Sequence, residues 1–388
     1  MTPLHATLRR YAEDRTVTGA VGLVARGADV EAVAVGSMDA GGSAPMERDA
    51  IFRIASITKP ITAAAVLMLV DEGLVGLGDP VERWLPELAK PVVVRTPAGP
   101  VDDVVPAARA VTVEDLLSFR TGWGTPDDFS LPAVRALTAV QRYDRPFGEW
   151  PDPDTWLRAL AEVPMLHQPG EAWLYGTSSD LQGVLVARAS GRALADFLAE
   201  RLFEPLGMRD TAFEVPASKR HRFTWAYHRA EDGTLRPADT PDGRYSGLPR
   251  FQSGGGGLVS TADDWLAFGR LLLNAGATAD GRRLLSPASV SRMTTNHLTA
   301  AQRAAATLFL EGQGWGYGGQ VDVTPADPWS VPGRYGWVGG TGTTAHIVPA
   351  TGTVTVLMTQ TAMTGPTPTP LMRDFWTVTA QAAVTAFG

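Results

Sequence analysis

A serine and a lysine three residues apart, Ser56 and Lys59, are the pair in this 388-residue chain best suited to nucleophilic chemistry. Residues three apart share a face of a helix, so a helix that begins near Ser56 would bring the hydroxyl and the amine together. The N–H groups at a helix start are unpaired and favour a negative charge. A desolvated lysine can take up the serine proton as a neutral amine. The pair therefore predicts a serine nucleophile with Lys59 as its activator.

The surroundings of this pair strengthen the prediction. Residues 61–70 are almost all apolar, and a helix is expected from about residue 56 to residue 72, ending at Gly73. A helix that is apolar on every side should be buried. Only three of the 34 basic residues are lysines, and lysine, unlike arginine, can give up its proton when it is desolvated. In the alternative reading, Ser56 only caps the helix and Lys59 extends toward solvent.

The composition argues against several other kinds of chemistry and partner. The net charge is −7 and no block of basic residues is present, which speaks against nucleic-acid binding. The chain has no cysteine, and its six histidines are scattered. The sequence also lacks the common zinc-protease, phosphate-loop and Gly-x-Ser-x-Gly motifs. We therefore expect neither a metal nor a cofactor.

The sequence also gives an expectation about location. The first residues do not have the pattern of a signal peptide. The longest apolar run, residues 61–70, is far shorter than the roughly 20 residues that span a bilayer. We therefore expect a cytoplasmic protein without a membrane partner. The oligomeric state cannot be predicted from the sequence.

Helical and strand patterns follow one another in an order that predicts an α/β (α+β) fold. The expected elements near the two ends are a helix over 2–14, a hairpin over 19–36, paired strands over 342–349 and 351–359, and a helix over 368–387. Residues 81–249 instead contain helical patches separated by long loops, and are predicted to form a mostly helical inserted domain. Residues 1–80 and 250–388 are predicted to build one discontinuous domain, an antiparallel sheet flanked by helices.

Three short motifs in order resemble those of the serine β-lactamase and penicillin-binding-protein superfamily. They are Ser56-Ile57-Thr58-Lys59, Tyr175-Gly176-Thr177 and Trp337-Val338-Gly339. Further stretches similar to the family are 111–122, 205–208 and 255–264, so the resemblance covers nearly the whole chain. It is closest to class C β-lactamases and to the family VIII carboxylesterases that share their fold.

The resemblance implies a role for each motif. Ser56 would be the acylated nucleophile, Lys59 its activator and Tyr175 a proton shuttle near the leaving group. The backbone N–H groups of Ser56 and Gly340 would stabilise the oxyanion, with Gly339 and Trp337 beside the substrate. Tyr175 could instead be a hydrogen-bonded core residue, and Trp337 could serve packing alone.

Two departures from the family pattern bear on the substrate. The second motif often ends in Asn, where this chain has Thr177, and the third often begins with Lys, where it has Trp337. The missing lysine removes a cation that would hold a substrate carboxylate, and an indole would offer an apolar face in its place. We therefore predict a cofactor-independent esterase that cleaves small neutral carboxylic esters through an acyl-enzyme. The alternatives are an amidase, peptidase, β-lactamase or acyltransferase at the same site, and a non-catalytic binding protein of this fold.

Overall fold

The centre of the protein is a seven-stranded antiparallel sheet built from both ends of the chain, in a computed structural model that describes residues 1–141 and 149–385. Its order is β2-β1-β13-β12-β11-β10-β9. The strands are β1 (Gly19–Arg26), β2 (Asp29–Gly36), β9 (Gly314–Trp315), β10 (Gln320–Val321), β11 (Tyr335–Gly339), β12 (Thr343–Val348) and β13 (Thr353–Thr359). β1 pairs with β13 from Ala20 opposite Thr359 to Arg26 opposite Thr353. The predicted joining of N- and C-terminal strands in one sheet is confirmed.

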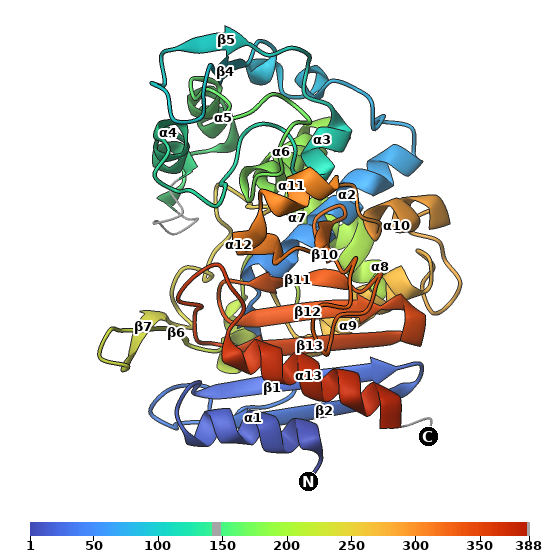
Figure 1. The fold of residues 1–388 in the computed structure, drawn as a ribbon. Helices are drawn as coiled ribbons and strands as arrows, with labels where there is room; N and C mark the ends of the chain where they lie inside the picture. The colour runs from blue at the N-terminus through green and yellow to red at the C-terminus, as the bar shows by residue number, and fades with distance from the viewer. Residues whose placement is uncertain (142–148, 386–388) are drawn as a thin grey trace.

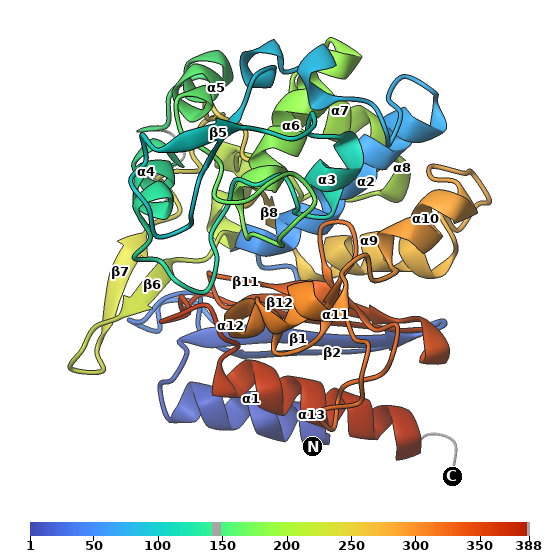
Figure 2. The same ribbon diagram turned by 45° about the horizontal axis from the view of Figure 1, so that its top comes forward.

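Helices cover both faces of this sheet, as the predicted fold class requires (Figure 1). The terminal helices α1 (Pro3–Glu13) and α13 (Pro370–Thr385) lie together on one face (Figure 2). On the other face α9 (Ala262–Leu273) packs on β1, β12 and β13. The apolar residues of α1 explain why it lies against the sheet. Leu4, Leu8 and Tyr11 recur at helical spacing and are the residues that the helix buries. The predicted mixed fold of helices and antiparallel sheet is confirmed.

The middle of the chain carries most of the remaining helices. They are α3 (Val113–Leu117), α4 (Pro132–Gln141), α5 (Pro153–Ala161), α6 (Thr177–Ser190), α7 (Leu194–Leu198) and α8 (Glu204–Leu206). Two small hairpins flank these helices in the chain, β4 (Val92–Val94) with β5 (Val104–Pro106) before them, and β6 (Ala226–Arg229) with β7 (Leu235–Asp239) after them. The division of the chain at residues 80 and 250 stays a prediction.

The helix α2 (Lys59–Asp71) links the sheet side of the molecule to these helices. Its residues from Lys59 to Leu69 are all buried, and it packs against α6 and α10 (Pro287–Met293). A helix without a polar face must be covered by neighbours on every side. The apolar run at 61–70 predicted this burial. The short strand β3 (Phe52–Arg53) precedes α2 in the chain and pairs with β8 (Val259–Ser260).

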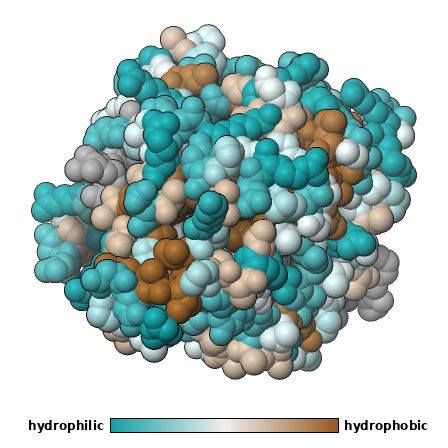
Figure 3. Space-filling view, turned by 90° about the horizontal axis from the view of Figure 1, so that it is seen from above, coloured by the Kyte–Doolittle hydropathy of each residue, from teal (hydrophilic) through white to brown (hydrophobic). Residues whose placement is uncertain are grey.

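The surface is mainly polar over the helices from the middle of the chain, which lie at the top of Figure 1. Figure 3 shows hydrophilic residues over most of this face, with hydrophobic residues gathered in small separate patches. Among the described residues, no helix has both the length and the apolar character needed to cross a membrane.

Candidate active site

The nucleophile candidate lies in a strained turn at the start of α2. The sequence predicted an α-helix from Ser56, but residues Ala55–Thr58 form a 3-10 helix, η1, and the α-helix begins at Lys59. Ala55 has φ +45°, in the left-handed region that costs a residue with a Cβ roughly 1–2 kcal/mol. The turn half-exposes Ser56 while its neighbours Ile57 and Thr58 are buried. The backbone thus presents a hydroxyl at the end of an otherwise buried segment.

Lys59 is held beside this hydroxyl. Its Nζ lies 2.9 Å from Ser56 Oγ and donates a hydrogen bond of 2.6 Å to the carbonyl of Gly255. The side chain is only 3% exposed, and its Nζ lies 4.8 Å from the centre of the Tyr175 ring. The alternative in which Lys59 extends toward solvent is therefore wrong. The structure places the Ser56 hydroxyl and the Lys59 amine within hydrogen-bonding distance, as the spacing of three predicted.

The second and third motifs meet at Tyr175. The half-buried Tyr175 ends the segment before α6, and its hydroxyl accepts a 2.8 Å hydrogen bond from the indole Nε1 of Trp337 on β11. Because an indole N–H can only donate, the O–H of Tyr175 keeps its own proton available for another acceptor. The structure therefore brings together the Ser56, Lys59 and Tyr175 predicted from separate motifs.

Trp337 is not placed as the sequence suggested. Its side chain is 2% exposed, packs edge-to-face on Trp315 with ring centres 4.8 Å apart, and is absent from the residues that line the cavity beside Ser56. β11 carries alternate side chains to opposite faces, and the indole lies among other aromatic rings beneath Tyr175. The expectation of an apolar indole face toward substrate is therefore corrected: Trp337 contacts the phenol of Tyr175.

The end of β11 lies against the nucleophile turn. A Cβ on Gly339 would overlap the carbonyl oxygen of Ile54, so only glycine permits this approach. Thr341 and Thr343, just beyond, donate to the carbonyls of Arg53 and Ile54 at 2.5 and 2.9 Å. Gly340 and Ser56 both line the cavity. Their N–H groups as a pair of oxyanion donors, with Gly339 next to the substrate, stay a prediction.

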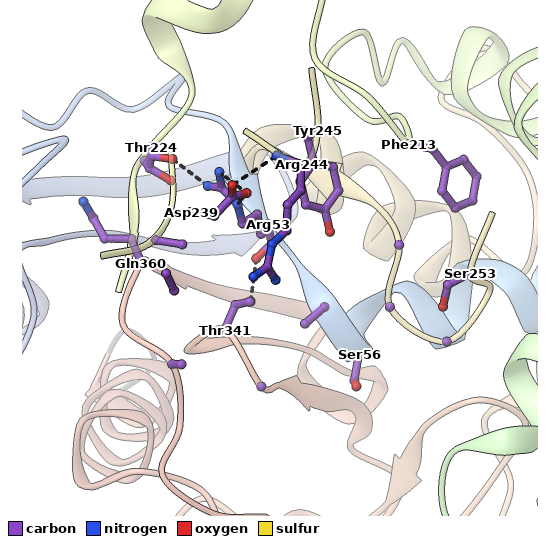
Figure 4. Close-up of a pocket in the computed structure, with 18 of the residues that line it drawn as sticks. Arg53, Ser56, Phe213, Thr224, Asp239, Arg244, Tyr245, Ser253, Thr341 and Gln360 are labelled. Carbon is purple, nitrogen blue, oxygen red and sulfur yellow. Dashed lines mark hydrogen bonds and ion pairs between the residues drawn. The ribbon is translucent and has the colours of Figure 1, made fainter. Parts of the chain in front are cut away.

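A cavity of about 430 Å³ opens beside these residues. One side consists of Ser56, Lys59, Tyr175 and Gly340, which we call the nucleophile side. The facing side, which we call the aromatic wall, comes from one stretch of the chain and includes Phe213, Trp225, Tyr227, Arg244 and Tyr245. Figure 4 shows Phe213, Arg244 and Tyr245 across the cavity from Ser56. This wall was not predicted, because no sequence motif marks its residues.

A buried ion pair joins the two sides. Arg53, three residues before Ser56, pairs with Asp239 of β7 at 2.7 Å, and both side chains are less than a tenth exposed. The guanidinium also donates to the carbonyls of Thr224 and Thr240 and lies 4.0 Å from the centre of the Phe223 ring (Figure 4). Burial lowers the pKa of Arg53, and Asp239 opposes this effect. The pair fixes the β6–β7 hairpin next to the nucleophile turn.

Two further polar residues of the cavity were missed in the sequence. Asp180, on α6, and Ser253 line the cavity, and both are buried. Asp180 lies five residues after Tyr175 inside a helix that is buried almost throughout, so a carboxylate there was a usable signal. Within residues 1–141 and 149–385, no three His, Asp or Glu side chains are grouped so that they could hold a metal ion.

The chain is similar to known proteins in sequence and in fold. The β-lactamase family matches residues 4–373 of the chain. An uncharacterized protein of Mycobacterium tuberculosis is 40% identical over 353 residues, 87% of this chain and 84% of that one. Esterase EstB of Burkholderia gladioli is 31% identical over 395 residues, 93% and 91% of the two chains. In fold, the chain resembles a solved simvastatin synthase variant of Aspergillus terreus, with TM-score 0.80, 24% identity, and 98% and 95% of the chains covered.

The match extends over the three motifs and over the strands from both ends of the chain that form the sheet. The family resemblance predicted from the motifs is confirmed, and with it the fold. The chain belongs to the β-lactamase family, whose fold carries serine hydrolases.

Proposed function

We propose that this protein hydrolyses small neutral carboxylic esters through an acyl-enzyme on Ser56. The observation that carries the proposal is the buried Lys59 amine 2.9 Å from the Ser56 hydroxyl, at the edge of a cavity large enough for a small ester. The esterase among the relatives supports ester cleavage as the reaction.

The residues support a two-step reaction. Ser56 Oγ attacks the ester carbonyl carbon and forms the C–O bond of the acyl-enzyme, while its proton passes to Lys59. The alcohol oxygen leaves with a proton from Tyr175, whose hydroxyl is oriented by the N–H of Trp337. The proton on Lys59 then passes to Tyr175, which restores both groups. A water molecule attacks the acyl carbon and gives up a proton to Lys59. The bond between the acyl carbon and Ser56 Oγ breaks as Oγ takes that proton back, and a carboxylic acid is released. Donors at the oxyanion position are each worth about 2.7–4 kcal/mol to such a transition state.

The preference for neutral esters rests on charge. The third motif carries Trp337 instead of lysine, and a charge-assisted hydrogen bond to a carboxylate is worth about 1.5–3 kcal/mol. Of the two guanidiniums that line the cavity within residues 1–141 and 149–385, Arg53 is already neutralised by Asp239, and Arg244 is exposed. Apolar acyl or alcohol groups would lie against the aromatic wall, since the Trp337 indole is buried.

The test compares three substrates with the purified protein. We expect kcat/KM to be largest for a neutral butyrate ester, about ten- to a hundredfold lower for the matched succinate monoester, and lower again for nitrocefin. Ser56→Ala protein is the control for background hydrolysis. A larger value for nitrocefin would overturn the esterase proposal, and a larger value for the succinate monoester would overturn the preference for neutral substrates.

Transfer to an alcohol is the alternative that uses the same acyl-enzyme. Adding an alcohol acceptor to the butyrate assay separates the two reactions, because transfer yields a new ester while hydrolysis yields butyrate. We expect butyrate as the main product.

A further inference from the structure

A glycine-rich loop, residues 253–257, lies between α2 and α6, the helices that begin at the ends of the first two motifs. A Cβ on Gly254 would overlap the Ser179 carbonyl on one side and the Thr62 methyl on the other. The loop therefore touches α6 and α2 at once, and only glycine fits there. A shift of this loop would therefore change its contacts with both α2 and α6.

The loop is tied to α2 by two hydrogen bonds. The Thr62 hydroxyl donates to the carbonyl of Gly254 at 2.8 Å, and Lys59 Nζ donates to the carbonyl of Gly255 at 2.6 Å. The second bond is the one that directs the amine, because Nζ lies between Gly255 and Ser56 Oγ, 2.9 Å away. The position of the Gly255 carbonyl thus sets the direction of Lys59.

On the other side the loop is tied to α6 by a single carboxylate. Asp180 is 1% exposed, and its Oδ1 accepts from the Ser253 hydroxyl at 2.6 Å and from the Gly255 N–H at 3.0 Å. Burying a carboxylate costs free energy unless it is hydrogen-bonded. The two hydrogen bonds offset this cost for Asp180, and the one from the Gly255 N–H holds Gly255 in place.

We infer that Asp180 is a positioning residue for the reaction proposed above: it holds Gly255 so that the Gly255 carbonyl keeps Lys59 directed at Ser56. The inference rests on that proposed function, since it concerns activation of the same serine. Asp180 would act through the loop and not by contact with substrate, although it also lines the cavity.

The test separates a loss of activation from a loss of binding or of folding. In Asp180→Ala the loop loses both hydrogen bonds, and we expect kcat for a neutral ester to fall about 10- to 100-fold with KM changed less than about threefold. The rate of Ser56 labelling by a fluorophosphonate probe should fall in parallel. Asp180→Asn keeps an acceptor oxygen at the same position and should retain kcat within about fivefold of the wild type.

Asp264 supplies the matched control. It is a buried carboxylate at the start of α9 that accepts from the Thr211 hydroxyl and the Asp210 N–H, both at 2.8 Å, and it is not among the residues that line the cavity. Asp264→Ala should lower the unfolding temperature while kcat stays within about twofold. If Asp180→Ala does not fold, Asp180→Glu, which adds a methylene and displaces the loop, should show the loss in kcat instead.

The outcomes are distinct. Unchanged kcat and labelling rate in Asp180→Ala, or in the folded Glu variant, would overturn the inference, as would a change confined to KM. An equal loss in Asp180→Asn and Asp180→Ala would also overturn it, because charge and not the hydrogen bond would then matter. If the wild-type protein shows no labelling of Ser56, the proposed function fails and the inference with it.

Discussion

The two sides of the cavity are built in opposite ways. The nucleophile side gathers residues from distant parts of the chain, Ser56 and Lys59, Tyr175 and Gly340. The first three make hydrogen bonds of 2.6–2.9 Å to one another or to buried neighbours. The aromatic wall comes from one stretch of the chain and offers ring surface, as in Trp225 and Tyr227, whose rings stack with centres 6.5 Å apart.

In the proposed reaction, the nucleophile side would supply reactivity and the aromatic wall would supply substrate selectivity. The nucleophile side needs definite atoms at definite distances, so its residue types are restricted and appear as short motifs. The aromatic wall only needs apolar area and shape, which many residues supply. We therefore expect changes on the nucleophile side to lower kcat steeply, and changes on the aromatic wall to alter KM and substrate choice.

The largest effect should follow removal of the nucleophile. Ser56→Ala keeps the Cβ of the turn and takes away the oxygen that the proposed reaction acylates, so turnover should fall by at least about 10³-fold. A fluorophosphonate probe with mass analysis of the labelled peptide checks the assignment. Labelling of another serine in the wild type, or labelling that survives the substitution, would show that Ser56 is not the nucleophile.

Lys59→Arg should give the next largest loss. The substitution keeps the positive charge and removes a group that can act as a base, so kcat should fall by at least about 10²-fold. Steady-state kinetics with a neutral ester measure it, and near-wild-type rates would reduce Lys59 to an electrostatic neighbour. Lys219→Arg, at the partly exposed ion pair with Asp210, is the matched control and should leave the rates unchanged.

Ser56 and Lys59 were predictable because the pattern that marks them lies within one short stretch of sequence. A spacing of three, an apolar run and a glycine that ends a helix all follow from neighbours in sequence. The same holds for the hairpin of β1 and β2 and for β12 and β13, whose alternation is long enough to see.

What the sequence did not reveal depends on partners far along the chain. Arg53 meets Asp239 across 186 positions, and Asp180 meets Gly255 across 75. The two-residue strands β9 and β10 are too short to show alternation. The buried position of Trp337 follows from packing of β11 against other aromatic rings, which no local pattern encodes.

Trp337→Phe should have an intermediate effect. It keeps most of the buried ring and removes the N–H that Tyr175 accepts, a bond worth about 0.5–1.5 kcal/mol. We expect kcat to fall about two- to tenfold with little change in KM. An altered preference between acyl chain lengths would instead mean that the indole meets the substrate.

A change on the aromatic wall tests the other half of the comparison. Trp225→Ala removes apolar area from the cavity, and we expect KM for a butyrate ester to rise about threefold while the labelling rate of Ser56 stays unchanged. Acetate and butyrate esters measured side by side show whether the loss grows with chain length. A large fall in the labelling rate would contradict the division between the two sides.

The smallest effect concerns pH and the stability of the sheet behind the cavity. Burial, with a contribution from Arg334, holds the pKa of His346 on β12 well below its usual value of about 6.5. Its folded-state pKa is depressed, so its contribution to stability is present above about pH 6.5 and is lost as the pH falls below that value, where the unfolded chain takes up the proton first. Thermal unfolding between pH 8 and 5 should show this loss in the wild type.

In His346→Gln the unfolding temperature should depend less on pH over the same range, whereas His221→Gln, at an exposed residue, should keep the wild-type slope. Because His346 lies outside the cavity lining, its substitution should leave kcat/KM for a neutral ester unchanged at pH 8, where the protein stays folded. Equal slopes for His346→Gln and the wild type would assign the acid sensitivity to other groups.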